Sequence, residues 1–284
     1  MTSDPGPDDH STPAGPGDPA ARFLALHVRG EPLLMPNAWD RGSARLLASL
    51  GFPALATTSS GFAATLGRLD GHVTRDEAIE HGGALVDAVD VPVSADLENG
   101  FCVDPADVAE TVAAAIDVGL AGCSIEDYAG RADDTIYDRG LAIERIAAAA
   151  EAAHGGPQRL VLTARAENHI HGRDDLDDTI ARLQGYQAAG ADVLFAPGVV
   201  APDDLRRLIE AVDLPVNVLV GPRTPTVPEL AELGVARISV GGSFAFAALG
   251  AVVEAGRELL ERGTTGYAAR AAEGRAAIEA PFSR

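Results

Sequence analysis

Short apolar segments alternate with longer helix-forming segments along almost the whole chain, and this alternation restricts the fold more than any other feature. The apolar segments lack interspersed polar residues, which indicates strands buried on both faces, as in a parallel sheet covered by helices. We expect eight strands, at residues 33–36, 54–57, 91–95, 122–125, 160–164, 193–196, 216–220 and 238–240. Between them we expect helices, among them residues 39–50, 74–89, 105–118, 138–153, 176–189 and 203–211.

Eight strand–helix units in one chain of 284 residues predict an α/β fold, a (β/α)8 TIM barrel, at residues 20–263. An open doubly wound sheet is the competing fold, but no Gly-x-Gly-x-x-Gly motif follows the first strand. Residues 1–19 are rich in Pro, Gly, Asp and Ser, so we expect an acidic, disordered tail. Residues 264–284 are expected to contain an extra C-terminal helix that packs on the barrel or reaches a neighbouring subunit.

The charge balance narrows the class of partner. With 42 acidic and 22 basic residues the formal net charge is −20, which disfavours binding to nucleic acid or to an anionic membrane surface. An anionic small molecule remains possible because a local cation can dominate inside a cleft. Apolar runs are too short to span a membrane, and the N-terminus lacks the features of a secretory signal. With only two cysteines, Cys102 and Cys123, we expect a cytoplasmic protein.

Polar residues follow most of the predicted strands. In a barrel of parallel strands the active site forms at the C-terminal ends of the strands, so these residues are expected to meet at one rim. They are Asn37, Asp40, Ser59, Ser60, Gly61, Asp96, Glu98, Asn99, Glu126, Asp127, Arg165, Glu167, Asn168, Asn217, Gly241 and Gly242.

Four carboxylates at this rim indicate a metal site: Asp70, Asp96, Glu98 and Glu126. Crowded acids repel one another unless a cation neutralises them, and their oxygen atoms suit Mg²⁺ or Mn²⁺. The alternative is that they are separately hydrated loop carboxylates or helix caps. Arg165 could bind a substrate carboxylate in two-pronged geometry, or form a structural salt bridge to Glu167 or Glu98.

Several short motifs resemble the isocitrate lyase/phosphoenolpyruvate mutase superfamily, in its phosphoenolpyruvate mutase-like or oxaloacetate decarboxylase-like branch. They read Ser-Ser-Gly at 59–61 with Leu-Gly-Arg-Leu-Asp at 66–70, Ala-Asp-Leu-Glu-Asn-Gly-Phe at 95–101, Ser-Ile-Glu-Asp at 124–127 and Ala-Arg-Ala-Glu-Asn at 164–168. The similarity extends in order from about residue 33 to residue 250.

The resemblance implies a Mg²⁺-binding barrel that stabilises a pyruvate-like enolate. By matching position, Asp96 would be the direct metal ligand, while the other three acids would hold waters on the metal. The backbone of Ser60 and Gly61 would bind the carboxylate or enolate oxygen, and Arg165 would hold the substrate. The resemblance also implies a homo-oligomer, a dimer or a tetramer, that exchanges the C-terminal helix between subunits.

The loop after the fourth strand departs from the family pattern. Isocitrate and methylisocitrate lyases carry Lys-Lys/Arg-Cys-Gly-His there, whereas this chain reads Tyr-Ala-Gly-Arg-Ala-Asp-Asp at 128–134. Tyr128 also replaces a Lys found in the mutases. Cys123 lies inside a predicted strand, and nothing beside Cys102 indicates an activated thiolate. Tyr128 and Arg131 are therefore our candidates for the acid or anion contact of this loop.

The expected function is a metal-dependent carbon–carbon lyase or decarboxylase acting on a small 2-oxo or 2-hydroxy carboxylate through a pyruvate enolate. One alternative is a phosphoenolpyruvate mutase-like or phosphonopyruvate hydrolase-like enzyme of the P–C bond. Another is a non-catalytic barrel that binds a 2-oxo acid. The expected substrate-binding residues are Trp39, Ser59, Ser60, Gly61, Arg165 and Asn217. We expect structural or solvent-facing roles for His169 and His171, and either a phosphate cradle or a tight turn at Gly241–Gly242.

Overall fold

The strands form one parallel sheet that curves into a barrel. The computed structural model describes residues 18–130 and 135–283, so the predicted tail falls almost entirely outside the described residues. The sheet order is β1-β9-β8-β7-β6-β5-β4-β3-β2. The strands are β1 (Leu33–Met35), β2 (Asn37–Ala38), β3 (Leu55–Thr57), β4 (Val93–Asp96), β5 (Gly122–Glu126), β6 (Val161–Arg165), β7 (Val193–Phe195), β8 (Val216–Leu219) and β9 (Arg237–Ser239).

Residues 33–38, which begin with the first predicted strand, close the ring because Pro36 divides them into β1 and β2. Proline has no backbone N–H, which interrupts the ladder at this position. Before the break β1 pairs with β9, and after it β2 pairs with β3, so the same stretch of chain reaches both of its neighbours. The Pro36 carbonyl still accepts a hydrogen bond from the backbone N–H of Ala56 at 3.0 Å. The prediction of a parallel α/β barrel is confirmed, with a nearly closed ring.

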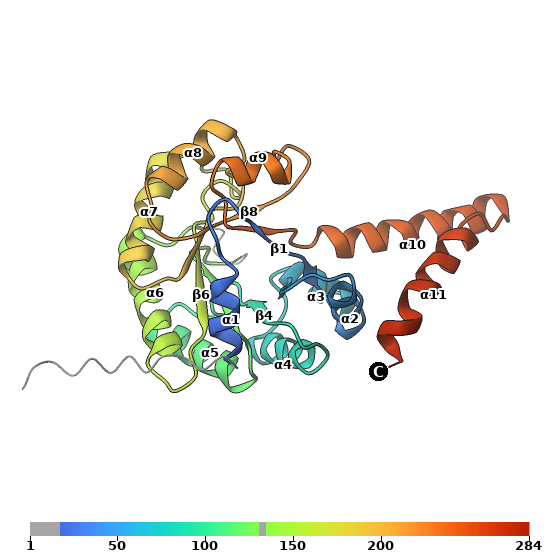
Figure 1. Cartoon of the computed structure of the whole chain (residues 1–284), viewed down its shortest axis with the longest axis horizontal. Helices are drawn as coiled ribbons and strands as arrows, with labels where there is room; N and C mark the ends of the chain where they lie inside the picture. The colour runs from blue at the N-terminus through green and yellow to red at the C-terminus, as the bar shows by residue number, and fades with distance from the viewer. Residues whose placement is uncertain (1–17, 131–134, 284) are drawn as a thin grey trace, which may run out of the picture.

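Helices surround the barrel (Figure 1). Several begin with the signals read in the sequence: Thr74 and Glu77 form a reciprocal capping box, and Asp104 caps a helix that starts with Pro105. The helices are α1 (Pro19–Ala25), α2 (Arg41–Ser49), α3 (Ser59–Thr65), α4 (Arg75–Val86), α5 (Pro105–Asp117), α6 (Arg139–His154), α7 (Leu176–Ala188), α8 (Pro202–Glu210), α9 (Val227–Glu232), α10 (Ser243–Arg262) and α11 (Ala268–Phe282).

The N-terminal end of the barrel is closed by α1. Phe23 is fully buried there and belongs to a small apolar cluster with Met35 and Val161. Gly122 makes this packing possible, since a Cβ atom at this position would lie 2.7 Å from Cε1 of Phe23 and 2.9 Å from the Val161 carbonyl oxygen. The barrel is thus sealed at this end, and its opening lies where the strands end.

The last two helices extend away from the barrel (Figure 1). Helix α10 contains one buried residue, Ala245, and exposes several large apolar side chains to solvent. Helix α11 turns back toward α2, where the ring of Phe282 lies near Gly42. The projecting part therefore begins at Ser243, earlier than residue 264, where the sequence places the boundary. Within the described residues, no helix combines the length and apolarity needed to cross a membrane.

Candidate active site

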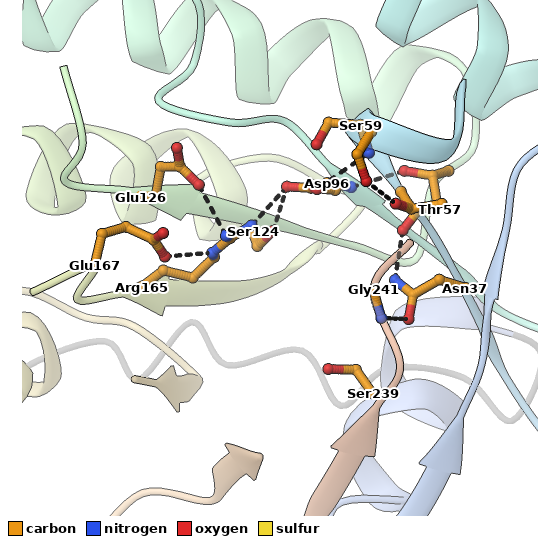
Figure 2. A network of polar contacts seen from close by, with 12 residues as sticks. Asn37, Thr57, Ser59, Asp96, Ser124, Glu126, Arg165, Glu167, Ser239 and Gly241 are labelled. Carbon is orange, nitrogen blue, oxygen red and sulfur yellow. Dashed lines mark hydrogen bonds and ion pairs between the residues drawn. The ribbon is translucent and has the colours of Figure 1, made fainter. Parts of the chain in front are cut away.

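Arg165, the last residue of β6, is the centre of the polar rim. Its guanidinium faces three carboxylates that lie at or just beyond the ends of β4, β5 and β6 (Figure 2). Nη1 lies 2.7 Å from Oδ1 of Asp96, Nη2 lies 3.0 Å from Oε2 of Glu126, and Nε lies 3.0 Å from Oε1 of Glu167. One cation thus neutralises acids that would otherwise repel each other. The two roles predicted for Arg165, a contact with a substrate carboxylate and a structural salt bridge, both remain open. Its salt bridge to Glu167 is present, and its guanidinium also faces the cavity.

Burial and mutual repulsion perturb the titration of this cluster. Burial raises the pKa of Glu126 well above its usual range, Arg165 opposes the shift, and Glu167 and Asp96 add to it. Burial also raises the pKa of Glu167, and Arg165 offsets part of that rise. Burial alone would lower the pKa of Arg165, but the three carboxylates together raise it well above its usual value. Strongly perturbed groups that share a cleft are typical of functional sites.

Asp96 is held in a fixed orientation by its neighbours. Its backbone N–H donates to Oγ1 of Thr57 at 2.8 Å, and its Oδ2 accepts from the backbone N–H of Ser59 at 3.2 Å. The hydroxyl of Ser124 donates to Oδ1 at 3.4 Å (Figure 2). Oδ2 is thus held from the start of α3 and Oδ1 from β5, so Asp96 cannot rotate freely.

Asn37 connects the first strand to the loop after β9. Its Nδ2 donates to the Thr57 carbonyl oxygen at 2.6 Å, and its Oδ1 accepts from the backbone N–H groups of Val240 and Gly241 at 3.0 and 2.9 Å. Gly241 has a positive φ of 55°, which glycine adopts easily. Its N–H is already bonded, so the geometry favours the tight turn over the phosphate cradle at Gly241–Gly242.

Two cavities meet at Arg165. The outer one, of about 1360 Å³, opens between the loops and is lined by Glu98, Glu126, Tyr128 and other residues. The inner one, of about 220 Å³, extends into the barrel past Asp96. Ser59, Asp70, Ile170 and Arg165 line both cavities. Arg165 therefore lies at the junction between an open vestibule and a small interior chamber.

The four predicted metal ligands lie along these two cavities. Asp70 lines both, Asp96 the inner one, and Glu98 and Glu126 the outer one. Oδ1 of Asp70 is buried without a hydrogen-bond partner in the described part of the chain, and such an atom needs a donor or a cation. Glu98 has a φ of 48°, an unfavourable backbone conformation for a residue other than glycine.

The predicted ligands would have to move relative to Arg165 in order to hold a divalent ion together. Within residues 18–130 and 135–283, no three potential ligands are close enough together to hold an ion. Arg165 lies between Asp96 and Glu126 and bonds to both (Figure 2). The carboxylates around Arg165, together with the unsatisfied Asp70 oxygen, supply the oxygen donors that suit a Mg²⁺ site.

The predicted substrate-binding residues of the first two rim loops differ in their access to the cavities. Ser59 and Ser60 line the inner cavity. Gly61 is buried, its N–H donates to Oγ1 of Thr58 at 3.3 Å, and it lines neither cavity. A Cβ atom on Gly61 would lie 3.1 Å from Cβ of Trp39. Trp39 packs there and also lines neither of the two cavities, so the structure does not bring it or Gly61 to the site.

The loop after β5 contributes Tyr128 to the outer cavity. The Tyr128 ring stacks on the imidazole of His171 with centroids 3.7 Å apart, and Nε2 of His171 lies 3.8 Å from Oε2 of Glu167. The sequence predicts a structural or solvent-facing role for His171, so its place in this cavity was not predicted. Its position three residues beyond the Ala-Arg-Ala-Glu-Asn motif was the available signal. Arg131 lies outside the described residues.

Neither cysteine has the surroundings of a reactive thiolate. Burial raises the pKa of the Cys102 thiol, and burial raises that of Cys123 further because its side chain is enclosed within β5. Cys102 lines the outer cavity, but its Sγ lies 3.1 Å from the Gly100 carbonyl oxygen. These surroundings agree with the expectation that neither thiol is activated.

Asn217 lies inside the barrel and contacts Arg237, a residue that the sequence did not single out. It is buried and lines the inner cavity, where its Nδ2 donates to Oγ of Ser239 at 2.9 Å. Its Oδ1 accepts from Nε of Arg237 at 3.0 Å, and Arg237 also lines this cavity. Arg237 directly precedes the predicted eighth strand, and nothing in the sequence singled it out.

Parallel strands, an outer ring of helices and a polar rim at the strand ends place this chain in the class of α/β-barrel proteins. The family model described as phosphoenolpyruvate phosphomutase matches residues 23–260. The chain therefore belongs to the phosphoenolpyruvate mutase/isocitrate lyase superfamily, as its motifs led us to expect, and this superfamily contains lyases and mutases.

Individual relatives cover most of the chain. An uncharacterized protein of Mycobacterium tuberculosis is 36% identical over 237 residues, or 83% of this chain and 87% of the relative. The 2,3-dimethylmalate lyase of Eubacterium barkeri is 28% identical over 230 residues, covering 76% of this chain and 77% of the relative. A crystal structure from Burkholderia cenocepacia J2315, provisionally described as a lyase/mutase, is 50% identical with a TM-score of 0.89 and covers 94% of this chain and 96% of that chain.

Proposed function

We propose that this protein is a Mg²⁺-dependent lyase or decarboxylase that breaks a carbon–carbon bond in a small 2-oxo or 2-hydroxy carboxylate and forms a pyruvate enolate. The observation that carries the proposal is Arg165, a half-buried guanidinium at the junction of two cavities with carboxylates on three sides. Such a group binds a carboxylate through two parallel hydrogen bonds. The similarity to a 2,3-dimethylmalate lyase supports cleavage of a C–C bond.

Asp96, with Asp70, Glu98 and Glu126, would hold the Mg²⁺ or Mn²⁺ ion. When bound, the ion would stabilise the negative charge that develops on the carbonyl oxygen of the substrate. The unsatisfied Oδ1 of Asp70 and the fixed orientation of Asp96 support this assignment. Binding requires Arg165 to release part of its contact with these acids, which frees guanidinium donors for the substrate.

The other proposed roles follow from which cavity each residue lines. Arg165 orients the substrate carboxylate, and the backbone and hydroxyls of Ser59 and Ser60 contact the substrate from the other side of the inner cavity. Tyr128 and His171 face the outer cavity, where the departing part of the substrate would lie. The phenol of Tyr128 can donate a proton there, in place of the thiol that related lyases carry in this loop.

Two other functions use the same site. A P–C bond enzyme is the first alternative, favoured by the description of the matching family model. Tyr128 argues against it, because the mutases that this sequence resembles carry a lysine at that position. A non-catalytic barrel that binds a 2-oxo acid is the second alternative, and it is distinguished by metal-dependent binding of oxalate, an enolate mimic, without turnover.

Pyruvate release from C4 to C7 2-oxo and 2-hydroxy acids tests the proposal. The assay is coupled to NADH oxidation and run with Mg²⁺ or with EDTA, beside a control without enzyme for spontaneous oxaloacetate decay. We expect Mg²⁺-dependent release that Asp96→Ala abolishes and Asp203→Ala preserves, since Asp203 is an exposed carboxylate on α8. If none of these acids releases pyruvate above background, the proposal is contradicted. Phosphonates would then be assayed next.

We also propose that the protein is a homo-oligomer, a dimer or a tetramer, in which α10 and α11 contact a neighbouring copy. The apolar side chains that α10 exposes support this proposal: Phe244, Phe246, Leu249, Val252, Val253, Leu259 and Leu260. Several large exposed apolar side chains on one helix are typical of a protein–protein contact.

A further inference from the structure

Asp127 is expected at the rim because it follows β5, but its carboxylate is buried behind the rim and lines neither cavity. Its Oδ1 accepts from the backbone N–H of Glu167 at 2.8 Å. Its Oδ2 accepts from the hydroxyl of Tyr186 at 2.5 Å and from Nη1 of Arg182 at 3.0 Å. One buried carboxylate therefore connects the loop after β6 to two side chains of α7.

The same group of contacts includes the far end of the loop after β5. Nη1 of Arg182 also donates to the Tyr137 carbonyl oxygen at 2.9 Å. The backbone N–H of Tyr137 donates to the Asp127 carbonyl oxygen at 2.8 Å. We refer to Asp127, Tyr137, Arg182 and Tyr186 together as the Asp127 network. It fixes the two ends of this loop against each other.

From Tyr137 the contacts continue to the loop after β4. The Tyr137 hydroxyl accepts from Nδ2 of Asn99 at 3.2 Å and donates to the Cys102 carbonyl oxygen at 3.4 Å. The guanidinium of Arg145, on α6, lies 4.5 Å from the centre of the Tyr137 ring and donates to the carbonyl oxygens of Cys102 and Asn99. Asn99, Cys102 and Tyr137 all line the outer cavity. Three neighbouring loops of this cavity are thus connected to one buried carboxylate.

The two side chains of α7 are enclosed and fully engaged. Tyr186 is completely buried and Arg182 is 3% exposed. Burial, reinforced by Asp127, raises the pKa of Tyr186 well above its usual value, so the phenol keeps its proton and donates a hydrogen bond. Nε of Arg182 also donates to Oδ2 of Asp178 at 2.7 Å. A satisfied buried network of this kind holds its members in one arrangement, and the loss of one donor leaves a buried acceptor incompletely bonded.

The Asp127 network is one contact away from the guanidinium at the centre of the site. The backbone N–H of Asp127 donates to the Arg165 carbonyl oxygen at 3.2 Å. Glu167, whose backbone N–H is held by the Asp127 carboxylate, places its Oε1 3.0 Å from Nε of Arg165. The position of the guanidinium therefore depends on a carboxylate that does not reach the cavities.

We propose that Tyr186 and Arg182 are positioning residues of the candidate active site, acting through Asp127. They fix Glu167 and, with it, the guanidinium of Arg165 relative to the loops after β4 and β5. The inference rests on the proposed function. A displaced guanidinium still binds a carboxylate but is no longer aligned with the reacting bond, so the loss falls on kcat rather than on KM.

Tyr186→Phe tests the inference in the full-length protein, because it removes one hydroxyl and keeps the buried ring. For Mg²⁺-dependent pyruvate release we expect kcat to fall about tenfold while KM stays within threefold of the wild type. Ile209→Val is the control for a loss of stability alone, since Ile209 is buried on α8 and lines neither cavity. It should lower the melting temperature and leave kcat and KM unchanged.

Arg182→Lys tests the second member of the pair. Lysine keeps the charge but lacks the planar fork that contacts Asp127, Tyr137 and Asp178 together. We expect a fall in kcat at least as large as in Tyr186→Phe. A folded Arg182→Lys protein with the kcat of the wild type overturns the role given to Arg182.

Hydrogen exchange measures the same effect without a substrate. In Tyr186→Phe we expect the backbone amides of residues 97–103 and 166–173 to exchange at least threefold faster than in the wild type, and those of α8 to be unchanged. Ile209→Val should give the opposite pattern, with faster exchange at α8 only. Unchanged exchange of both loop segments in Tyr186→Phe overturns the inference.

The two measurements separate this inference from the proposed function. If the wild type releases pyruvate and Tyr186→Phe has the same kcat, or loses only in KM, the positioning role is wrong and the proposed function stands. A wild type that releases no pyruvate contradicts the proposed function. Hydrogen exchange alone then decides whether the Asp127 network fixes the loops.

Discussion

The guanidinium of Arg165 and the carboxylate of Asp96, 2.7 Å apart, join the ends of β6 and β4 across the intervening strand β5. Asp96 is the predicted metal ligand and Arg165 the predicted substrate clamp, so the residues assigned to the ion and to the substrate contact each other directly.

The geometry of Arg165 predicts that lysine cannot replace it. Arg165→Lys keeps a positive charge among Asp96, Glu126 and Glu167 but loses the planar fork that contacts all three. We expect kcat/KM for pyruvate release to fall at least 100-fold, about 3 kcal/mol of transition-state stabilisation. Arg159→Lys is the matched control, since Arg159 pairs with Asp192 outside both cavities. Equal activity of the two variants would show that two-pronged binding is not required.

The unsatisfied oxygen of Asp70 predicts a specific loss of metal affinity. Asp70→Asn removes a charge from the ion site and preserves the side-chain volume, so we expect the Mg²⁺ dissociation constant to rise 10- to 100-fold. Titration of the metal-free protein measures this directly. Asp76→Asn is the control, because Asp76 is exposed at the start of α4. An unchanged constant in Asp70→Asn would place the ion elsewhere.

Much of this architecture could be read from the sequence because its signals are local. Unalternated apolar runs located the strands, and the residues that follow them located the rim, including Asp96, Glu126 and Arg165. The break at Pro36 is visible in the sequence, but its role in joining both sides of the ring depends on which strands pair. The side-chain directions at the rim, such as Arg165 turning toward three acids, depend on long-range packing.

Other features depend on contacts between residues far apart in the chain. Gly61 carries a backbone N–H that the resemblance assigns to the substrate, yet Thr58 accepts its hydrogen bond as a helix cap. Arg237 is one charged residue beside an apolar run, and only the barrel geometry turns it inward. The departure of α10 from the barrel could not be predicted, since its sequence has an apolar face whether it covers strands or a neighbouring chain.

A buried histidine behind the site predicts a pH-dependent change in stability. His81 stacks on Phe62 with ring centroids 3.8 Å apart, and its Nε2 is buried without a partner among the described residues. Burial lowers its pKa from 6.5 to about 4. Between these values the unfolded chain takes up a proton that the folded protein does not, so stability falls as the pH falls from about 6.5 toward 4.

His81→Phe keeps the stack and removes this proton uptake. The free energy of unfolding of the variant minus that of the wild type is expected to be about 2 kcal/mol larger at pH 5 than at pH 7.5, since each pKa unit corresponds to about 1.4 kcal/mol. Urea unfolding at the two pH values measures this difference. An equal difference at both pH values would mean that His81 titrates alike in the folded and unfolded chains.

The exposed apolar surface of α10 predicts how the subunits assemble. Leu260 is 88% exposed, so Leu260→Glu should leave the barrel intact while placing a charge in any contact that α10 makes with a second copy. We expect the wild type to sediment as a dimer or tetramer and the variant to dissociate toward monomer at micromolar concentration. Leu50→Glu is the control because Leu50 is an exposed leucine at the end of α2, away from α10. A wild-type protein that sediments as a monomer would contradict the proposed contact, and so would a Leu260→Glu variant that keeps the wild-type mass.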